Sequence, residues 1–346
     1  MRNQIAVAFA LTTGLSFGFA AENAGVASVK TYLLERLSLQ KAGTAQLEVA
    51  ADKYLELAKA VNFDYVKLAA QPETVRRALK DARAGWSKAS PVYESIEGIV
   101  AGVEMLASFD VNLDAGSSKA EGGDAMVEFD LKLANGKTLQ KPGNAFGVNE
   151  GALWGTEKGF SSNVKFDVDG DGKMGFGDQL PDANVLKAAA DKLDALTQEL
   201  IDTGKKWTPS SGDVFGALAA NVPTVAPVFI DRWKTSRFIL GEKATRRDFN
   251  VISSLNDLSG NIASWQRLYT GVSASVKAKN ASLDRQIVDG LSSLKAWTAK
   301  LETQENSRRF TPEQAEAILK EGDNRATAIT GKITQAAALL GVKVGN

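Results

Sequence analysis

The chain has 346 residues, of which 44% are hydrophobic, and it carries 41 basic and 41 acidic side chains. This composition is typical of a soluble globular protein that is long enough for one large or two ordinary domains. Because the formal net charge is zero, there is no basic field that would favour a nucleic acid or an anionic membrane surface as partner.

The sequence contains neither histidine nor cysteine. Disulfide bonds and thiolate metal sites are therefore excluded, as are Ser-His-Asp, Cys-His and His-Glu-x-x-His catalytic sites within one chain. Any metal must be held by oxygen ligands, which suit hard ions such as calcium, magnesium, manganese or ferric iron.

Residues 1–21 have the pattern of a secretory signal peptide. Arg2 precedes an apolar stretch from Ile5 to Phe19, and the small residues Ala20 and Ala21 follow. The alternative is an uncleaved membrane anchor, but the stretch is short for a span and includes threonine and serine. We expect cleavage, no membrane span in the mature chain, and a location in the periplasm, the cell envelope or the medium.

Helical periodicity dominates the first part of the mature chain. Apolar residues over Tyr32–Val61 predict one long or two short amphipathic helices. A second helix is expected to begin near Pro72 and a third at Ser90–Pro91, because proline suits the first helical turn. A further helix is predicted after the N-cap Asp182, with Gly204 closing it.

A segment of about 115–180, rich in glycine and aspartate, interrupts this pattern. Apolar and charged residues alternate over Val127–Leu133, and Asn135–Gly136 follows, which predicts a two-stranded hairpin within 125–140. One short helix is expected near Glu150–Trp154.

A proline- and glycine-rich loop around 209–227 is predicted to separate two halves. Beyond it, three strong helical patterns cover 249–269, 283–301 and 312–340, and the last opens with a capping box at Thr311. The predicted fold is all-α, with an N-terminal helical bundle over 28–204 and a C-terminal bundle over 205–346.

One acidic segment has the spacing of an EF-hand calcium loop, with acids at positions 1, 3, 5 and 12 and glycine at position 6. The alternative is a plain solvated turn of the same composition. Because residues 161–166 read as extended rather than helical, we expect a structural calcium ion that ties down the insertion, not a switch. The predicted ligands are Asp167, Asp169, Asp171 and Asp178, with the backbone carbonyl of Lys173.

Several segments resemble a known family. Residues 93–100, Tyr-Glu-Ser-Ile-Glu-Gly-Ile-Val, are similar to the Y-x-x-I-E-P-I-A signature of the imelysin-like family, which includes the EfeO-type iron-uptake proteins. The runs 308–315, 325–329 and 335–340 resemble the end of EfeO-type chains. Together with shorter matches within 236–258, the resemblance covers most of the mature chain.

The family has an H-x-x-E motif that precedes an L-W-G sequence. Here 153–155 supply Leu-Trp-Gly and Glu150 stands in the place of the acid, but Gly147 stands where the histidine would be. The resemblance implies two helical bundles with a metal cleft between them, and it implies Glu97 and Glu150 as retained ligands of a degenerate site, with Tyr93 as a neighbour.

The helical pattern gives independent support for Glu97. It shares a mostly apolar stripe with Tyr93 and Glu104, and a carboxylate on such a face is costly unless it is paired or binds a metal. The alternative is that Glu97 faces solvent at the edge of the stripe or pairs with an arginine such as Arg83 or Arg237.

The leading hypothesis is an exported EfeO-type envelope protein, associated with iron uptake, that binds structural calcium and a second hard metal ion such as iron. The alternative is a structural or interaction protein of the envelope, in which the metal cleft is vestigial and an envelope protein is the partner. A peptidase is less supported, because without histidine neither a zinc site of the usual kind nor the usual general base can be assembled.

Overall fold

The computed structural model describes residues 13–344 except 124, 245 and 247. The first twelve residues of the predicted signal peptide lie outside this range. The described chain is mainly helical with two small sheets, which confirms the predicted all-α class.

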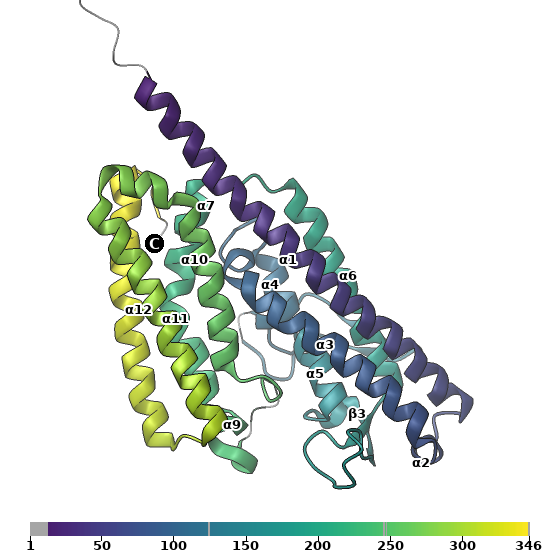
Figure 1. The fold of residues 1–346 in the computed structure, drawn as a ribbon. Helices are drawn as coiled ribbons and strands as arrows, with labels where there is room; N and C mark the ends of the chain where they lie inside the picture. The colour runs from purple at the N-terminus through teal and green to yellow at the C-terminus, as the bar shows by residue number, and fades with distance from the viewer. Residues whose placement is uncertain (1–12, 124, 245, 247, 345–346) are drawn as a thin grey trace, which may run out of the picture.

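Helix α1 (Thr13–Ala60) is one long helix, so the single-helix alternative is correct. It lies along α3 (Pro72–Val100) and α6 (Ala183–Lys206) (Figure 1). The turn between α1 and α3 holds the short α2 (Tyr65–Ala69). Gly43 of α1 and Gly85 of α3 allow the two helices to approach closely. A Cβ added at Gly85 would lie 2.6 Å from the backbone nitrogen of Leu47. The helix pair therefore packs backbone against backbone.

Helix α3 runs through Pro91 without ending, so the predicted boundary at Ser90–Pro91 is wrong. Proline removes one helical hydrogen bond and crowds the preceding turn. Apolar residues on both sides of Pro91 are fully buried, from Val75 to Ile99, and the helix packs against α1 on one side and α10 on another. This burial offsets the cost of the proline.

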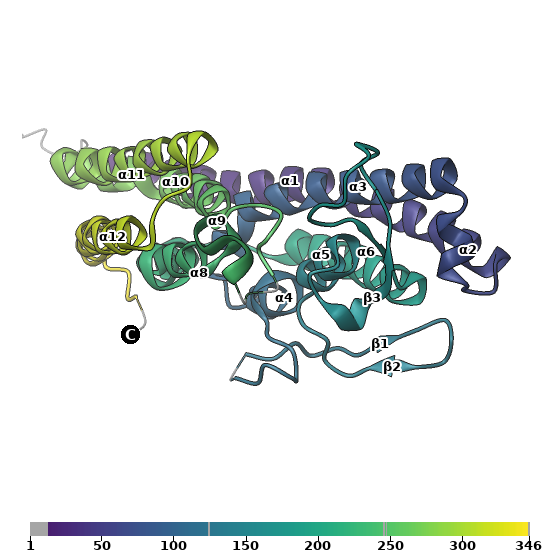
Figure 2. The same ribbon diagram turned by 90° about the horizontal axis from the view of Figure 1, so that it is seen from below.

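The predicted hairpin is present but short. Strands β1 (Leu131–Lys132) and β2 (Thr138–Leu139) pair antiparallel, with Leu131 opposite Leu139. Gly136 takes a positive φ of 82° in the turn. Figure 2 shows the hairpin on the side of the molecule away from α1 and α3.

The rest of the insertion consists of short elements. It begins with α4 (Ala107–Asp110) and a π-helical turn, η1 (Val111–Ala115), and continues with α5 (Ala145–Trp154) and a 3-10 turn, η2 (Lys158–Phe160). Strands β3 (Ser161–Lys165) and β4 (Gln179–Pro181) then pair antiparallel and enclose the aspartate loop.

Helix α6 begins as predicted and ends two residues late. Asp182 is the N-cap and accepts hydrogen bonds from the backbone nitrogens of Asn184 and Val185. Gly204 does not close the helix, because it is buried against Leu33 and Leu34 of α1 and the helix continues to Lys206.

The predicted loop around 209–227 is helical instead. Ser210 and Asp213 form a capping box at the start of α7, and Pro223 and Pro227 stand in the first turns of the next two elements, where proline is tolerated. The turn-forming residues therefore begin helices. The elements are α7 (Ser211–Asn221), η3 (Val222–Val225), η4 (Ala226–Ile230), α8 (Asp231–Thr235), α9 (Arg237–Leu240) and η5 (Gly241–Lys243).

This apolar stretch also has the length and hydropathy of a membrane span. Ser211–Thr235 reaches a mean hydropathy of 1.5, and half of its most apolar window is buried inside the protein. Core helices of globular proteins share these properties.

Three long helices complete the fold: α10 (Ser254–Lys279), α11 (Ala281–Ser307) and α12 (Pro312–Leu340). The predicted capping box at Thr311 is confirmed, with Gln314 as its partner. They lie side by side at one end of the molecule (Figure 1), and α10 also packs against α3 and α1. The contact between α3 and α10 is where the acidic residues gather.

Candidate functional site

The site is assembled where α3 crosses α10. Glu94 and Glu97 are one turn apart on α3, and Asp257 and Asn261 are one turn apart on α10. The helices touch at Gly260, where an added Cβ would lie 2.7 Å from the Cβ of Glu94. The close approach is why four polar side chains at this crossing are shielded from water.

Two more acids come from the segment after α3: Asp110 ends α4, and Asp114 lies in the π-helical turn η1 that follows it. π-Helical turns are rare and frequently found at functional sites. One carboxylate oxygen each from Glu94, Glu97 and Asp114 lies within 4.8 Å of the others. We call Glu94, Glu97, Asp110, Asp114 and Asp257 the acidic cluster; Asp110 is half-buried and the other four are buried.

Neutral donors satisfy part of the cluster. Asn261 Nδ2 donates to Glu94 Oε2 at 3.0 Å and also to Glu97 Oε2. The Tyr93 hydroxyl donates to Asp110 Oδ1 at 2.8 Å. Asp114 Oδ2 and Asp257 Oδ2 are two of the ten buried side-chain atoms, among the described residues, that have no hydrogen-bond partner. Unpartnered buried oxygens are uncommon in folded proteins and call for an explanation.

Burial and repulsion between carboxylates raise the pKa values of four members of the cluster. Burial, followed by the neighbouring carboxylates, raises the pKa values of Glu94 and Asp257 well above the ordinary range. Burial also raises the pKa of Asp114 strongly, and it raises that of Asp110 to about 8. Neutral protonated acids or a bound cation would each relieve the repulsion.

A single guanidinium, that of Arg232 on α8, faces the cluster among the described residues. Burial acts against its charged form, but Asp114 and Glu97 outweigh this and raise its pKa. The Arg232 guanidinium also stacks on the ring of Phe249, 4.2 Å from the ring centre. One fixed positive charge therefore faces five carboxyl groups.

Glu150, on α5, serves mainly as an anchor. Its carboxylate accepts hydrogen bonds from three consecutive backbone nitrogens, those of Phe249 at 2.9 Å, Asn250 at 2.7 Å and Val251 at 2.9 Å. Burial nevertheless raises the pKa of Glu150 to about 7. Phe249 has a positive φ of 55°, so this clamp holds a strained segment just before α10.

A small cavity connects Glu150 with the acidic cluster. Glu94, Asp114, Glu150 and Asp257 all line it, so the two acids that the sequence indicated, Glu97 and Glu150, lie in the same region. Only Glu97 has a carboxylate oxygen within the tight group of three.

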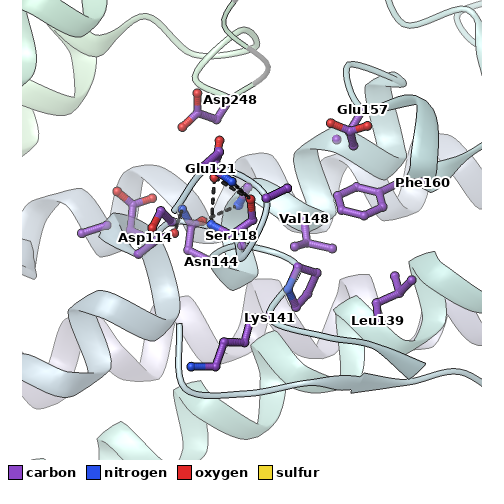
Figure 3. A pocket seen from close by; sticks show the side chains of 18 of the residues that line it. Asp114, Ser118, Glu121, Leu139, Lys141, Asn144, Val148, Glu157, Phe160 and Asp248 are labelled. Atoms are coloured by element: carbon purple, nitrogen blue, oxygen red, sulfur yellow. Dashed lines mark hydrogen bonds between the residues drawn. The ribbon is translucent and has the colours of Figure 1, made fainter. Parts of the chain in front are cut away.

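A larger cavity of about 700 Å³ opens beside the cluster (Figure 3). Asp114 lines both cavities, as does Gly147 in the first turn of α5. The Asn144 side chain caps this turn by accepting a hydrogen bond from the Gly147 nitrogen at 2.7 Å. The cavity therefore leads from the surface to one of the buried acids.

The aspartate loop is a separate site at the end of the β3–β4 pair. Asp167, Asp169 and Asp171 each place a carboxylate oxygen within 4.8 Å of the others. The buried Asp178 carboxylate is occupied elsewhere, since Oδ1 accepts from the Val168 nitrogen at 3.0 Å and Oδ2 from the Gly175 nitrogen at 2.7 Å.

Lys173 contributes its backbone nitrogen, which donates to Asp171 Oδ1 at 2.7 Å. Basic residues of α3 hold the loop from outside: Arg76 donates to the carbonyl of Asp167 at 3.2 Å, and Lys80 to that of Asp169 at 2.8 Å. Burial acts to raise the pKa of Asp167, but hydrogen bonds from backbone nitrogens within the loop outweigh it and lower the pKa.

The sequence analysis missed Glu94, Asp110, Asp114, Asp257 and Arg232. Glu94 had a local signal, because it lies three residues before Glu97 on the same helical face. The others come from separate elements and had none. Glu104, expected on the stripe of Glu97, is exposed because α3 ends at Val100.

The two arginines considered as partners of Glu97 bind backbone carbonyls elsewhere. Arg83 donates to the carbonyls of Leu153 and Gly177, and Arg237 donates to that of Asn250 at 2.9 Å. The positively charged side chain that interacts electrostatically with Glu97 is that of Arg232 instead.

The family model described as Imelysin matches residues 34–339. No curated protein matches the chain.

Proposed function

The chain belongs to the imelysin family, and we propose that it binds one hard metal cation in the acidic cluster between α3 and α10. The observation that carries this proposal is the pair of unpartnered buried oxygens, Asp114 Oδ2 and Asp257 Oδ2, in a group of five carboxyl groups that faces one guanidinium.

The donors fit such a cation. Carboxylate and amide oxygens suit calcium, magnesium, manganese and ferric iron, and the chain has no histidine or cysteine for softer ions. Glu94, Glu97 and Asp114 would hold the ion, with Asp257 next to them. The ion would supply positive charge to the buried carboxylates, which among the described residues face the guanidinium of Arg232.

We propose an exported, EfeO-type protein of the periplasm or cell envelope that serves iron uptake. The apolar segment after Arg2 and the resemblance of residues 93–100 support this role.

A second, structural ion is proposed for the aspartate loop. The convergence of Asp167, Asp169 and Asp171 supports calcium there, with the carbonyl of Lys173 as a further ligand. Asp178 would first have to release its hydrogen bonds from Val168 and Gly175 if it is to join them.

One observation favours the alternative of a structural or interaction protein. Glu150 stands at the position of the family acid, and its carboxylate accepts hydrogen bonds from three backbone nitrogens. Its role in this chain is then to hold the segment before α10, and the cavity would be vestigial.

Metal analysis of purified variants separates these possibilities. The chain lacking the predicted signal peptide is purified without chelator, equilibrated with calcium and with manganese or ferric citrate, and its metal content is measured by mass spectrometry. We expect Glu97→Gln/Asp114→Asn to lose the manganese or iron of the acidic cluster but keep calcium in the loop, and Asp167→Asn/Asp169→Asn to do the reverse.

Glu104→Gln is the matched control, because it changes an exposed glutamate just beyond α3. If no metal besides calcium responds to the cluster variants, the cluster is not a metal site and the structural alternative holds.

A further inference from the structure

Resting on the proposed function, we propose that the cation is bound as a complex with a small polycarboxylate, and that this organic ligand occupies the cavity of Figure 3. The cation would face Asp114 at the inner end, and the carboxylate groups of the ligand would face the arginines of the cavity wall.

The size of the cavity supports an organic ligand. Its volume is about 700 Å³, within the usual range for small-molecule sites of roughly 300–1,000 Å³. An ion with one or two waters would need only some tens of Å³, since a water occupies about 30 Å³. The space in front of Asp114 is therefore much larger than an ion requires.

The charges of the wall are mixed in a way that suits a metal complex. Arg232 and Arg246 both line the cavity together with Asp114 and Asp248. A bare cation would meet two guanidinium groups on its way to Asp114. A cation carried by carboxylates would present negative groups to them, and the planar guanidinium fork matches a carboxylate with two parallel hydrogen bonds.

Arg246 is the better candidate to receive the ligand. Its guanidinium is partly exposed and lies 3.1 Å from Asp248 in a local ion pair, so it can exchange partners without leaving water completely. Arg232 is committed to the buried cluster by the charges of Asp114 and Glu97.

The inner wall provides room and a fixed surface. Gly143, Gly147 and Gly151 line it and contribute no side chains. Phe249 also lines the cavity, and its backbone nitrogen donates a hydrogen bond to Glu150 Oε2 that holds it in place. A planar or branched carboxylate could therefore lie against backbone and ring without competing side chains.

Equilibrium dialysis of the chain lacking the predicted signal peptide tests the inference with four probes: ferric citrate labelled in both iron and citrate, citrate alone, ferric acetohydroxamate, and manganese ion alone. We expect citrate and iron to be retained together in equal amounts. Citrate alone should bind at least about tenfold more weakly, because the cation is then missing from its contact with Asp114.

Variants locate the ligand. Arg246→Gln should weaken ferric citrate binding about tenfold, the effect of one lost charge-assisted hydrogen bond, and leave manganese binding unchanged. Arg246→Lys should recover part of the loss. Arg325→Gln is the matched control, since Arg325 also forms a local ion pair, with Glu321 on α12, far from the cavity.

Two results would overturn the inference while leaving the proposed metal site intact: equal retention of iron from acetohydroxamate without citrate, or citrate binding that does not depend on iron. If neither iron nor manganese is retained in any form, the proposed function itself fails.

Discussion

The acidic cluster and the aspartate loop both gather carboxylates, but in opposite surroundings. In the loop, Asp169 and Asp171 are exposed, and their carboxylates accept hydrogen bonds from backbone nitrogens. In the cluster, Glu94 and Asp257 are buried and share few donors, which raises their pKa values. The comparison teaches that adjacent residues of a loop can bring acids together where water and backbone nitrogens compensate their charges. At a helix crossing the acids are buried, and their ionisation is unfavourable until a cation binds.

The largest expected effect is on metal affinity at the cluster. Replacing Glu97 by Gln removes one negatively charged metal ligand from the buried cluster. The affinity for manganese should therefore fall by on the order of a hundredfold or more. The same change in the loop, Asp169→Asn, should weaken calcium binding less, because water screens exposed charges. Titration calorimetry on both variants measures the difference. Equal losses at the two sites would show that burial does not distinguish them.

The next effect concerns the segment that Glu150 holds. Gln at this position presents an amide nitrogen to a backbone donor, so at least one hydrogen bond is lost and the free energy of unfolding should fall by about 2 kcal/mol. Denaturant unfolding at neutral pH measures this change, with the exposed Glu128→Gln as control. An unchanged midpoint would mean that the three hydrogen bonds from 249–251 contribute little.

A third effect is the pH dependence of the metal-free protein. The folded pKa of Asp110, about 8, lies above its unfolded value near 4, so the stability from this group is complete below pH 4 and is lost as pH rises toward 8. Glu94, Asp114 and Asp257 act in the same direction. We expect the free energy of unfolding to fall between pH 5 and 8 by up to about 1.4 kcal/mol per pH unit for each titrating group.

Bound manganese should flatten or reverse this trend, because the ion competes with protons for the same oxygens. Denaturant unfolding at several pH values, with and without manganese, provides the comparison. Stability that rises with pH in the metal-free chain would show that the cluster is ionised and compensated in some other way.

The smallest expected effect is removal of calcium from the loop. Removing calcium with a chelator should lower the melting temperature by no more than about 2–4 °C, because the loop lies at the end of the β3–β4 pair, outside the helical core. Hydrogen exchange should increase within 166–180 and remain unchanged in α3 and α10. Faster exchange throughout the helices would mean that the ion supports the whole fold.

The sequence predicted the features that depend on neighbours in the chain. The capping box at Thr311 and the N-cap at Asp182 are examples, as are the hairpin turn at Asn135–Gly136 and the all-α class. Local rules failed at Pro91, where tertiary burial outweighs the cost of a proline within a helix.

The site divides in the same way. The aspartate loop is visible as a motif because its residues are adjacent, although the hydrogen bonds of Asp178 are not. Asp114 and Asp257 are more than a hundred positions apart and meet only through the crossing of α3 and α10 and the π-helical turn. No spacing rule joins such residues, so only the three-dimensional arrangement reveals the acidic cluster.

The length of α1 limits how this protein can move. After the expected cleavage, its residues 22–60 form a stiff helix about 58 Å long that contacts α3, α6 and α10. At its crossing with α10, Gly25 and Gly271 bring the two backbones together. A hinge motion of α10–α12 relative to α3 and α6 would have to bend α1 or shift it along α10 at the contact between Gly25 and Gly271. Capture and release of a ligand are therefore expected to depend on small displacements of the clamped segment 248–253 and of the turn that carries Asp114.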